Sequence, residues 1–328
     1  MQILAGDIGG TNTRLALFDT SSPTWPKPTI ETSYPSPAHP SVESILEQFI
    51  SQHRLSNIDL ACFGLAGPVI DQVCETTNLP WRVVAANITK QFSFKQSWLL
   101  NDLEANAWGI ETLESSDIFT LNQGSDSAAG NRSIISAGTG LGEAGLLWDG
   151  NRYHPFPSEG GHTDFSPNSN LEYALYEHLA GHYGHVSWER IISGPGLEML
   201  YRFICKYRTA TTPDWLQQQM NSIGVAPAVS GAAMDKSDAI CEETLDLFIH
   251  LYGREAGNHA LKIMATGGVY LGGGIAPQIL PLLKEGGFMR GFLDKGRMQQ
   301  LVASMPVKII LNDKTALLGA AHYASLQN

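Results

Sequence analysis

The sequence predicts an α/β fold with two domains, and three observations lead to this prediction. The chain has 328 residues, about the length of two ordinary domains. Strand-like apolar segments alternate with segments of helical apolar spacing, which is typical of helices layered on a sheet. An apolar strand, a glycine-rich turn, a second strand and an Asp occur twice, at 3–19 and 133–149. This repeat indicates an internal duplication, although two unrelated glycine-rich hairpins would look much the same.

The N-terminal elements follow from apolar spacing and from turn residues. Residues 3–19 predict a hairpin, and the proline-rich segment 21–41 predicts a loop with edge structure. Helical spacing predicts a helix over 42–53, and an unbroken apolar run predicts a buried strand over 60–66. The remaining expected elements of this half are a short strand at 98–100 and a helix at 103–110.

The C-terminal elements are predicted in the same way. The hairpin pattern of 133–149 is followed by loop-rich sequence over 150–170. Helical and strand-like patterns then alternate to the end of the chain. The expected helices are 171–183, 196–206, 245–264 and 314–325, and the expected strands are 307–311 and 266–275, which runs into three consecutive glycines.

Composition excludes several classes of protein. Apolar residues make up 43% of the chain, too many for a disordered protein. The net charge of −11 would repel a phosphate backbone, so we expect no nucleic-acid partner. The four cysteines have neither zinc-knuckle nor CxxC spacing and favour a reducing compartment. No basic leader and no apolar run of about 20 residues occur, so we expect a cytoplasmic protein with no membrane partner.

The first glycine-rich turn suits a phosphate ligand. Gly9, Gly10 and Thr11 carry little side chain, so backbone N–H groups and a hydroxyl can approach an anion. Asp7 would repel phosphate unless Mg²⁺ lay between them, which makes Asp7 a candidate Mg²⁺ ligand through water. The alternative is a structural turn with a capping Asp. Segment 140–145 also matches G-x-G-x-x-G, but a strand rather than a helix follows it, which argues against a dinucleotide site.

Five short motifs occur in order along nearly the whole chain, and each is weak alone. They are 6–12, 100–102, 137–142, 159–162 and 271–275, with further matching segments at 77–81, 187–190, 193–196 and 294–297. The ordered set resembles the bacterial glucokinases, of the actin-like (ribonuclease H-like) sugar kinase superfamily. The resemblance implies two α/β domains, 1–110 plus 303–328 and 111–302, with the active site in the cleft between them.

The resemblance also implies a reaction and its residues. The implied reaction is the ATP-dependent phosphorylation of D-glucose at the 6-hydroxyl, with Mg²⁺ as cofactor. The resemblance also implies a homodimer and a role in glycolysis. Asp102 would be the catalytic base. The implied ATP-binding residues are Gly6, Asp7, Ile8, Gly9, Gly10, Thr11, Gly138, Thr139, Gly140, Gly272, Gly273 and Gly274. The implied sugar ligands are Asn78, Asn101, Asp102, Glu159, His162 and Glu189.

Physical chemistry agrees with these roles but also allows plainer ones. Phosphoryl transfer needs a carboxylate to accept the hydroxyl proton, and Asp102 follows a strand and opens a helix. Asp is equally a favoured helix N-cap, so the residues alone leave both roles open. Glu159 and Glu189 could bind neighbouring hydroxyls or be ordinary solvated acids. His162 could equally be a packed or exposed histidine.

Other functions remain as alternatives. The nearest is a kinase for another hexose or an N-acetylhexosamine. A sugar-sensing regulator would need a DNA-binding segment ahead of Gly6, and an actin-like or chaperone-like ATPase would lack paired acids for a sugar. His178, His182 and His185 suggest zinc, but no Cys or carboxylate completes a tetrahedral set. The related repressor and kinase group carries a Cys-rich zinc motif that is absent here, which favours the glucokinase branch.

Overall fold

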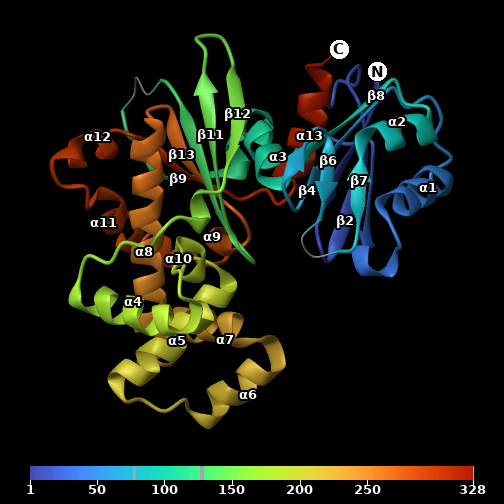
Figure 1. Cartoon of the computed structure of the whole chain (residues 1–328). Helices are drawn as coiled ribbons and strands as arrows, with labels where there is room; N and C mark the ends of the chain where they lie inside the picture. Colours follow the sequence, from blue (N-terminus) through green and yellow to red (C-terminus); the bar gives the residue numbers. More distant parts are fainter. Residues whose placement is uncertain (77–78, 126–128, 328) are drawn as a thin grey trace. The chain divides into compact units, whose positions relative to one another are not determined.

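A computed structural model describes residues 1–76, 79–125 and 129–327 (Figure 1). The chain divides into two compact units, which we describe separately. Unit 1 comprises Met1–Asp117, His154–Pro157 and Asn312–Asn328, and unit 2 comprises Ile118–Tyr153 and Ser158–Leu311. The boundaries 1–110 plus 303–328 and 111–302 stay a prediction for the domains. No helix in the described part of the chain is both long and apolar enough to cross a membrane.

Unit 1 contains a five-stranded sheet in the order β3-β2-β1-β4-β8. The predicted hairpin is antiparallel, whereas β4 and β8 continue the sheet in parallel. All residues of β4 are buried, as the unbroken apolar run predicts. The strands are β1 (Gln2–Ile8), β2 (Asn12–Asp19), β3 (Ile30–Pro35), β4 (Leu60–Leu65) and β8 (Gln96–Asn101).

Helices cover both faces of this sheet. One buried cluster joins the sheet to α1 (Val42–Gln52) and α2 (Ala85–Phe92), and a second joins it to α3 (Asp102–Gly109) and α13 (Thr315–Ser325). The last two helices pack backbone to backbone, because a Cβ at Gly109 or Gly319 would overlap the opposite helix. A small antiparallel sheet contributes to the first cluster and contacts β8, with strands β5 (Val69–Ile70), β6 (Val73–Glu75) and β7 (Arg82–Val84).

Unit 2 contains a six-stranded sheet in the order β12-β11-β10-β13-β14-β9. Its hairpin, β10–β11, is antiparallel, and β13 and β14 continue it in parallel. The strands are β9 (Ile118–Asn122), β10 (Arg132–Ala137), β11 (Leu141–Trp148), β12 (Tyr153–Ser158), β13 (Gly268–Gly272) and β14 (Val307–Ile310). The compact body of unit 2 extends to Leu311 and so includes β14.

The two large sheets share one topology. In each, a hairpin strand has two parallel neighbours in succession: β1 is followed by β4 and β8, and β10 by β13 and β14. The similarity thus extends from the two hairpins to five strands of each sheet, with β9 added at the edge of the second. Shared strand order over this length supports the predicted duplication.

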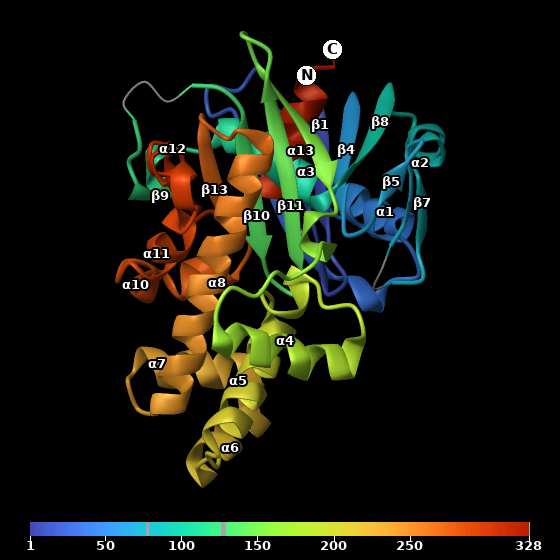
Figure 2. The same ribbon diagram turned by 60° about the vertical axis from the view of Figure 1, so that its left-hand side comes forward.

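The long helix α8 (Ala239–Ile263) packs on β10 and forms the centre of the unit 2 core (Figure 2). It begins six residues earlier than the sequence predicts, after Asp238, whose side chain accepts a hydrogen bond from Cys241 N–H. The other longer helices of unit 2 are α4 (Asn170–Tyr183), α5 (Gly194–Arg208), α6 (Asp214–Ile223) and α7 (Val225–Met234), of which α5 and α7 pack on α8. The shorter ones are α9 (Ile275–Gln278), α10 (Leu280–Leu283), α11 (Gly287–Leu293) and α12 (Gln299–Ala303).

Candidate functional site

The first glycine-rich turn joins β1 to β2 and is held from outside the hairpin. The Gly9 N–H donates to Asn12 O at 3.0 Å, which closes the turn. The Ser36 hydroxyl donates to Gly9 O at 2.7 Å and lies 2.9 Å from the Thr13 hydroxyl. Thr11 remains exposed at the tip. The turn is therefore fixed by several hydrogen bonds and presents backbone and a hydroxyl to solvent, as a phosphate-binding turn requires.

Asp7 carries a partly buried carboxyl group beside other acids. Burial raises the pKa of Asp7 to about 6, Asp102 and Asp313 add to this effect, and Arg14 opposes it. Arg14 is directly across the hairpin from Asp7, but its guanidinium also donates to the Asp313 carboxylate at 2.9 Å. The negative charge at Asp7 is thus incompletely balanced by the protein, which suits a bound cation.

The donor chemistry at Asp7 fits Mg²⁺. No group of three His, Cys, Asp or Glu residues capable of holding a metal occurs in the described part of the chain. Mg²⁺ usually keeps several waters and takes only one or two protein carboxylates, with substrate phosphates completing its shell. A single carboxylate at the base of a glycine-rich turn meets that requirement.

Asp102 is the first residue of α3, and its neighbour Asn101 is the N-cap. The Asn101 Oδ1 atom accepts hydrogen bonds from Leu103 N–H at 3.0 Å and Glu104 N–H at 3.4 Å. Asp102 Oδ1 also accepts from Leu103 N–H, at 2.8 Å. The interpretation of Asp102 as the N-cap is therefore wrong, because Asn101 fills that position. Its proximity to Asp7, which it affects electrostatically, places two acids near the first turn.

Two residues that the sequence did not single out support the Asn101–Asp102 segment. Gln72 bonds both backbone groups of Leu99 in β8, accepting from its N–H at 2.8 Å and donating to its carbonyl at 3.3 Å. The Asn101 amide donates to Gly67 O at 3.1 Å. These hydrogen bonds from side chain to backbone connect residues about 30 positions apart. A local sequence pattern therefore cannot predict them.

The second and third glycine segments lie side by side in unit 2. They follow the neighbouring parallel strands β10 and β13, in which Ser136 pairs with Gly272. Gly138 N–H donates to Gly140 O at 2.9 Å and closes the second turn. Gly273 has φ +77°, and a Cβ there would overlap the Ala137 backbone, so only glycine fits comfortably. By contrast, a Cβ at Gly138 or Gly274 would meet nothing within 4 Å, so both turns leave open backbone.

Glu159, His162 and Glu189 converge in unit 2. His162 Nε2 lies 3.8 Å from Glu159 Oε2, and His162 Nδ1 lies 3.9 Å from Glu189 Oε1. Glu159 is 76% exposed and His162 59% exposed, whereas Glu189 is 26% exposed. Three polar side chains from two separate segments thus lie together, with His162 close to both glutamates. This is the arrangement expected of a site that binds several neighbouring hydroxyls.

The second glycine turn holds Glu189 directly. Glu189 Oε2 accepts from Leu141 N–H at 3.0 Å, and a Cβ at Gly140 would lie 2.5 Å from the same oxygen. Ser193 donates its hydroxyl hydrogen to Glu189 O at 2.7 Å while capping α5. Two motifs far apart in the sequence are therefore parts of one structure.

The three neighbouring histidines do not share one location. The rings of His178 and His182 on α4 contact each other at a tilt of 55°, with centroids 4.9 Å apart. His185 Nε2 instead lies 3.0 Å from His162 O, and its Nδ1 lies 3.2 Å from Asp164. His185 therefore braces the loop that carries His162. Asn78, the remaining expected sugar ligand, lies outside the described residues.

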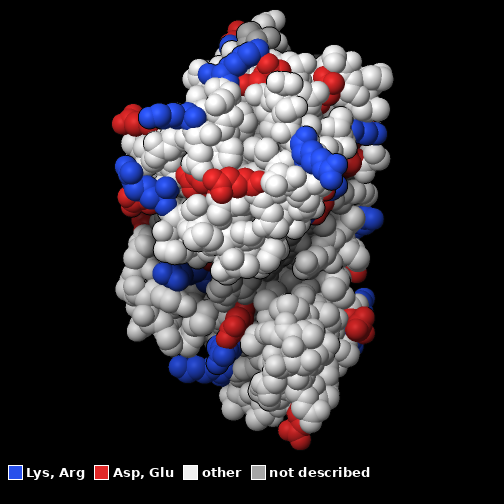
Figure 3. All heavy atoms as spheres, turned by 90° about the vertical axis from the view of Figure 1, so that its right-hand side faces the viewer, with Lys and Arg blue, Asp and Glu red and all other residues white. Residues whose placement is uncertain are grey.

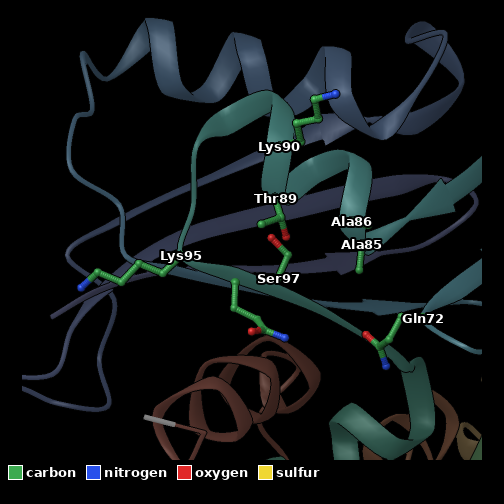
Figure 4. A pocket seen from close by; sticks show the side chains of 8 residues that line it. Gln72, Ala85, Ala86, Thr89, Lys90, Lys95 and Ser97 are labelled. Carbon is green, nitrogen blue, oxygen red and sulfur yellow. The ribbon is translucent and has the colours of Figure 1, made fainter.

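A pocket of about 380 Å³ occurs elsewhere in unit 1 (Figure 4). Its lining includes Gln72, Thr89 and Ser97 but none of the expected site residues. In Figure 4 the Lys90 and Lys95 side chains extend away from the Thr89 and Ser97 hydroxyls, and Lys95 pairs with Asp59 at 2.6 Å. On the surface shown in Figure 3, acidic and basic side chains are interspersed.

Comparison with known proteins places this arrangement in a family. The family described as Glucokinase matches residues 4–327. A glucokinase of Synechocystis sp. is 41% identical, covering 98% of this chain and 97% of its own. The crystal structure of a glucokinase from an Antarctic psychrotroph superposes with a TM-score of 0.85 at 29% identity, covering 99% of both chains. A ROK family glucokinase from Streptomyces griseus, solved with glucose and AMPPNP, has the same fold with a TM-score of 0.67, at 19% identity and covering 99% of this chain and 100% of its own.

Proposed function

The chain belongs to the glucokinase family, and we propose how its residues carry out the ATP-dependent phosphorylation of D-glucose. The fold is the two-domain actin-like sugar kinase fold. The observation that carries the assignment of residues is the cluster of Glu159, His162 and Glu189, which is held on the second glycine turn through Leu141. The comparisons do not favour another hexose or an N-acetylhexosamine as substrate, because the full-length relatives are glucokinases.

Each end of the reaction has its own set of residues. We assign Glu159 and Glu189 to accept hydrogen bonds from glucose hydroxyls, with His162 between them. Asn101 is assigned to the sugar and Asp102 to the 6-hydroxyl, whose proton it accepts as the oxygen attacks the γ-phosphorus. The bond between the γ-phosphorus and the β–γ bridging oxygen breaks, and ADP leaves with that oxygen. The turns at 9–11, 138–140 and 272–274 are assigned to supply backbone N–H groups for ATP; Gly272 itself is buried in β13, whereas Gly273 and Gly274 are exposed.

Mg²⁺ is assigned to Asp7, whose carboxylate lies below the first turn. When bound, Mg²⁺ neutralises charge on the β- and γ-phosphates. Asp7 itself supplies the negative charge that keeps a hydrated cation at the turn. The positive charge of Arg14 partly offsets the charge of Asp7.

A coupled assay tests this function. Purified protein is given glucose and ATP with Mg²⁺, glucose 6-phosphate is measured, and ADP or polyphosphate then replaces ATP. We expect turnover with ATP and a higher kcat/KM for glucose than for mannose, fructose or N-acetylglucosamine. Absence of glucose 6-phosphate with every donor would contradict the function, and a higher kcat/KM for another sugar would contradict the specificity.

Glu159→Gln and Glu189→Gln each test the sugar assignment. Gln keeps the size but loses the charge-assisted hydrogen bonds, so glucose binding should weaken by about 1–3 kcal/mol. Glucose KM and calorimetric glucose binding measure the effect. Glu177→Gln on the exposed side of α4 is the matched control and should change neither. Parental glucose affinity in both site variants would return these residues to ordinary surface acids.

Gly140→Ala and Gly138→Ala separate the two tasks of the second turn. The new Cβ at 140 would lie 2.5 Å from Glu189 Oε2, whereas the Cβ at 138 would meet nothing within 4 Å. We expect Gly140→Ala to displace Glu189 and raise glucose KM about tenfold or more. Gly138→Ala should leave glucose binding intact and raise the KM for ATP. Equal effects of both substitutions on glucose binding would show that Glu189 does not depend on Gly140.

We also propose a cytoplasmic homodimer that serves glycolysis. The described cysteines are all free thiols, as expected in a reducing compartment. The product, a phosphorylated hexose, is the starting material for further sugar breakdown. Sedimentation velocity at micromolar concentration tests the oligomeric state.

A further inference from the structure

The inner face of β11 carries a buried ion pair that the reaction does not use. Glu143 is 1% exposed and His259 of α8 is 3% exposed, and Glu143 Oε2 lies 3.1 Å from His259 Nδ1. The second ring nitrogen, Nε2, lies 3.0 Å from Ala144 O. A carbonyl only accepts, so Nε2 carries a hydrogen. The other ring nitrogen, Nδ1, faces the Glu143 carboxylate.

The pair lies directly under the loop that carries Glu159 and His162. A Cβ added at Gly160 would overlap Glu143 Oε2 and lie 2.8 Å from its Cδ, and a Cβ at Gly161 would overlap Leu141 O. The 3₁₀ turn Gly160–His162 thus rests on two residues of β11, Leu141 and Glu143. Leu141 also holds Glu189 through its N–H. Both segments that carry the sugar ligands are accordingly supported by the same short stretch of one strand.

A buried carboxylate is a costly way to fill this position. Glu143 Oε1 has no hydrogen-bond partner among the described residues, and an unsatisfied buried acceptor destabilises the fold. A second acid, Glu255, lies on the same helix as His259 and is fully buried; burial, with Glu143 nearby, raises the pKa of Glu255 to about 7. An apolar side chain would be favoured here if the position served stability alone.

We propose that Glu143, fixed by His259, is a positioning residue for the glucose-binding loop. It connects α8 to the loop through a hydrogen-bonded carboxylate against which the backbone at Gly160 packs. This contact holds the loop in the position in which His162 lies close to both Glu159 and Glu189. Because Glu143 touches neither sugar nor ATP in this scheme, its loss should raise glucose KM and leave the KM for ATP and most of kcat unchanged. The inference rests on the sugar-binding role assigned to Glu159 and Glu189.

The test compares Glu143→Ala with Glu143→Gln. Gln can donate its amide hydrogen to the unprotonated Nδ1 of His259 and still support Gly160, so it should keep glucose KM within about threefold of the parent. Ala leaves the loop unsupported, and glucose KM should rise about 10- to 100-fold, the size of effect a misplaced binding group produces. Leu245→Ala, in the buried core of α8, is the control for lost stability. It should lower the melting temperature without raising glucose KM.

Gly160→Ala provides a second route that does not remove Glu143. Its Cβ collides with the carboxylate in the parent but finds space in the Glu143→Ala background, although Ser158 Oγ at 3.1 Å stays close. We expect the two substitutions together to raise glucose KM by much less than the product of their separate effects, which is the signature of direct coupling. If Glu143→Ala does not fold, Gly160→Ala alone must raise glucose KM with an unchanged KM for ATP.

Three results would overturn the proposal. In the first, Glu143→Ala folds and keeps the parental glucose KM. In the second, Glu143→Ala changes the KM values for glucose and ATP in the same way as Leu245→Ala does. In the third, the effects of Glu143→Ala and Gly160→Ala on glucose KM are independent. These results differ from failure of the sugar assignment itself, in which Glu159→Gln and Glu189→Gln would leave glucose affinity unchanged.

Discussion

Asp102→Asn should lower kcat by about 10²–10⁴-fold, the usual cost of losing a general base. Asn has nearly the same shape and can still hydrogen-bond a hydroxyl, but it cannot accept the proton that leaves the 6-hydroxyl. Glucose binding should therefore persist. Turnover, calorimetric glucose affinity and melting temperature are measured together on the purified variant.

The structure makes this test sharper than the sequence does. Asn101, rather than Asp102, caps α3, so neither Asp102→Asn nor Asp102→Ala should remove a helix cap. Ser41→Ala is the matched stability control, because Ser41 caps α1 and accepts from Ser44 N–H at 3.3 Å. That control should lose about 1 kcal/mol of stability and keep full turnover. Near-normal turnover in a stable Asp102→Asn would remove Asp102 as the base.

Local pattern was sufficient for much of the fold. The hairpins 3–19 and 133–149 and the helix at 42–53 are confirmed by β1–β2, β10–β11 and α1. In these segments the periodicity of apolar residues matches the side of the element that is buried. The segment 21–41 is confirmed as loop with an edge strand, since β3 is at the end of its sheet.

Other elements could not be predicted because their cause is not local. The strands β5 and β6 have two and three residues, too few to show any alternation. The helix α7 packs on α8 and α6 packs on α7, and α7 includes Pro227 and many small residues. Sequence spacing therefore carries little signal for these segments.

The candidate site shows the same division. Short motifs indicated the glycine-rich turns and the acidic residues Asp7, Asp102 and Glu159. Glycine runs and acidic residues are unusual next to apolar strands, which made these segments stand out. The sequence left Asp102 open between catalytic base and N-cap, and only the structure shows that Asn101 is the cap. Glu143 is one charged residue within an otherwise apolar strand pattern, and only the fold reveals that His259, more than 100 positions later, is its partner.

Asp7→Asn should weaken the use of MgATP and at the same time stabilise the protein at neutral pH. The first effect follows from loss of the charge that retains the cation, and a 10- to 100-fold rise in the KM for MgATP corresponds to about 1.5–3 kcal/mol for a charge-assisted contact. Glucose binding should be unchanged. Parental kinetics with MgATP in Asp7→Asn would contradict the assignment of the first turn to phosphate.

The second effect follows from the pKa of Asp7, which is raised from 3.8 to about 6, mainly by burial. Between these values the folded protein keeps a proton that the unfolded chain has released, so stability falls as pH rises through the window. At pH 7.5 the ionised Asp7 lowers the free energy of unfolding by at most about 3 kcal/mol. Screening by water at this partly exposed group makes the loss smaller. Asn carries no charge, so urea unfolding should show Asp7→Asn more stable than the parent at pH 7.5, with the difference shrinking towards pH 4.5. If the buried charge is retained for the cation, Asp7→Asn should lose MgATP affinity and gain stability together. If Asp7→Asn is instead equally stable or less stable than the parent at pH 7.5, the protein already balances this charge by itself.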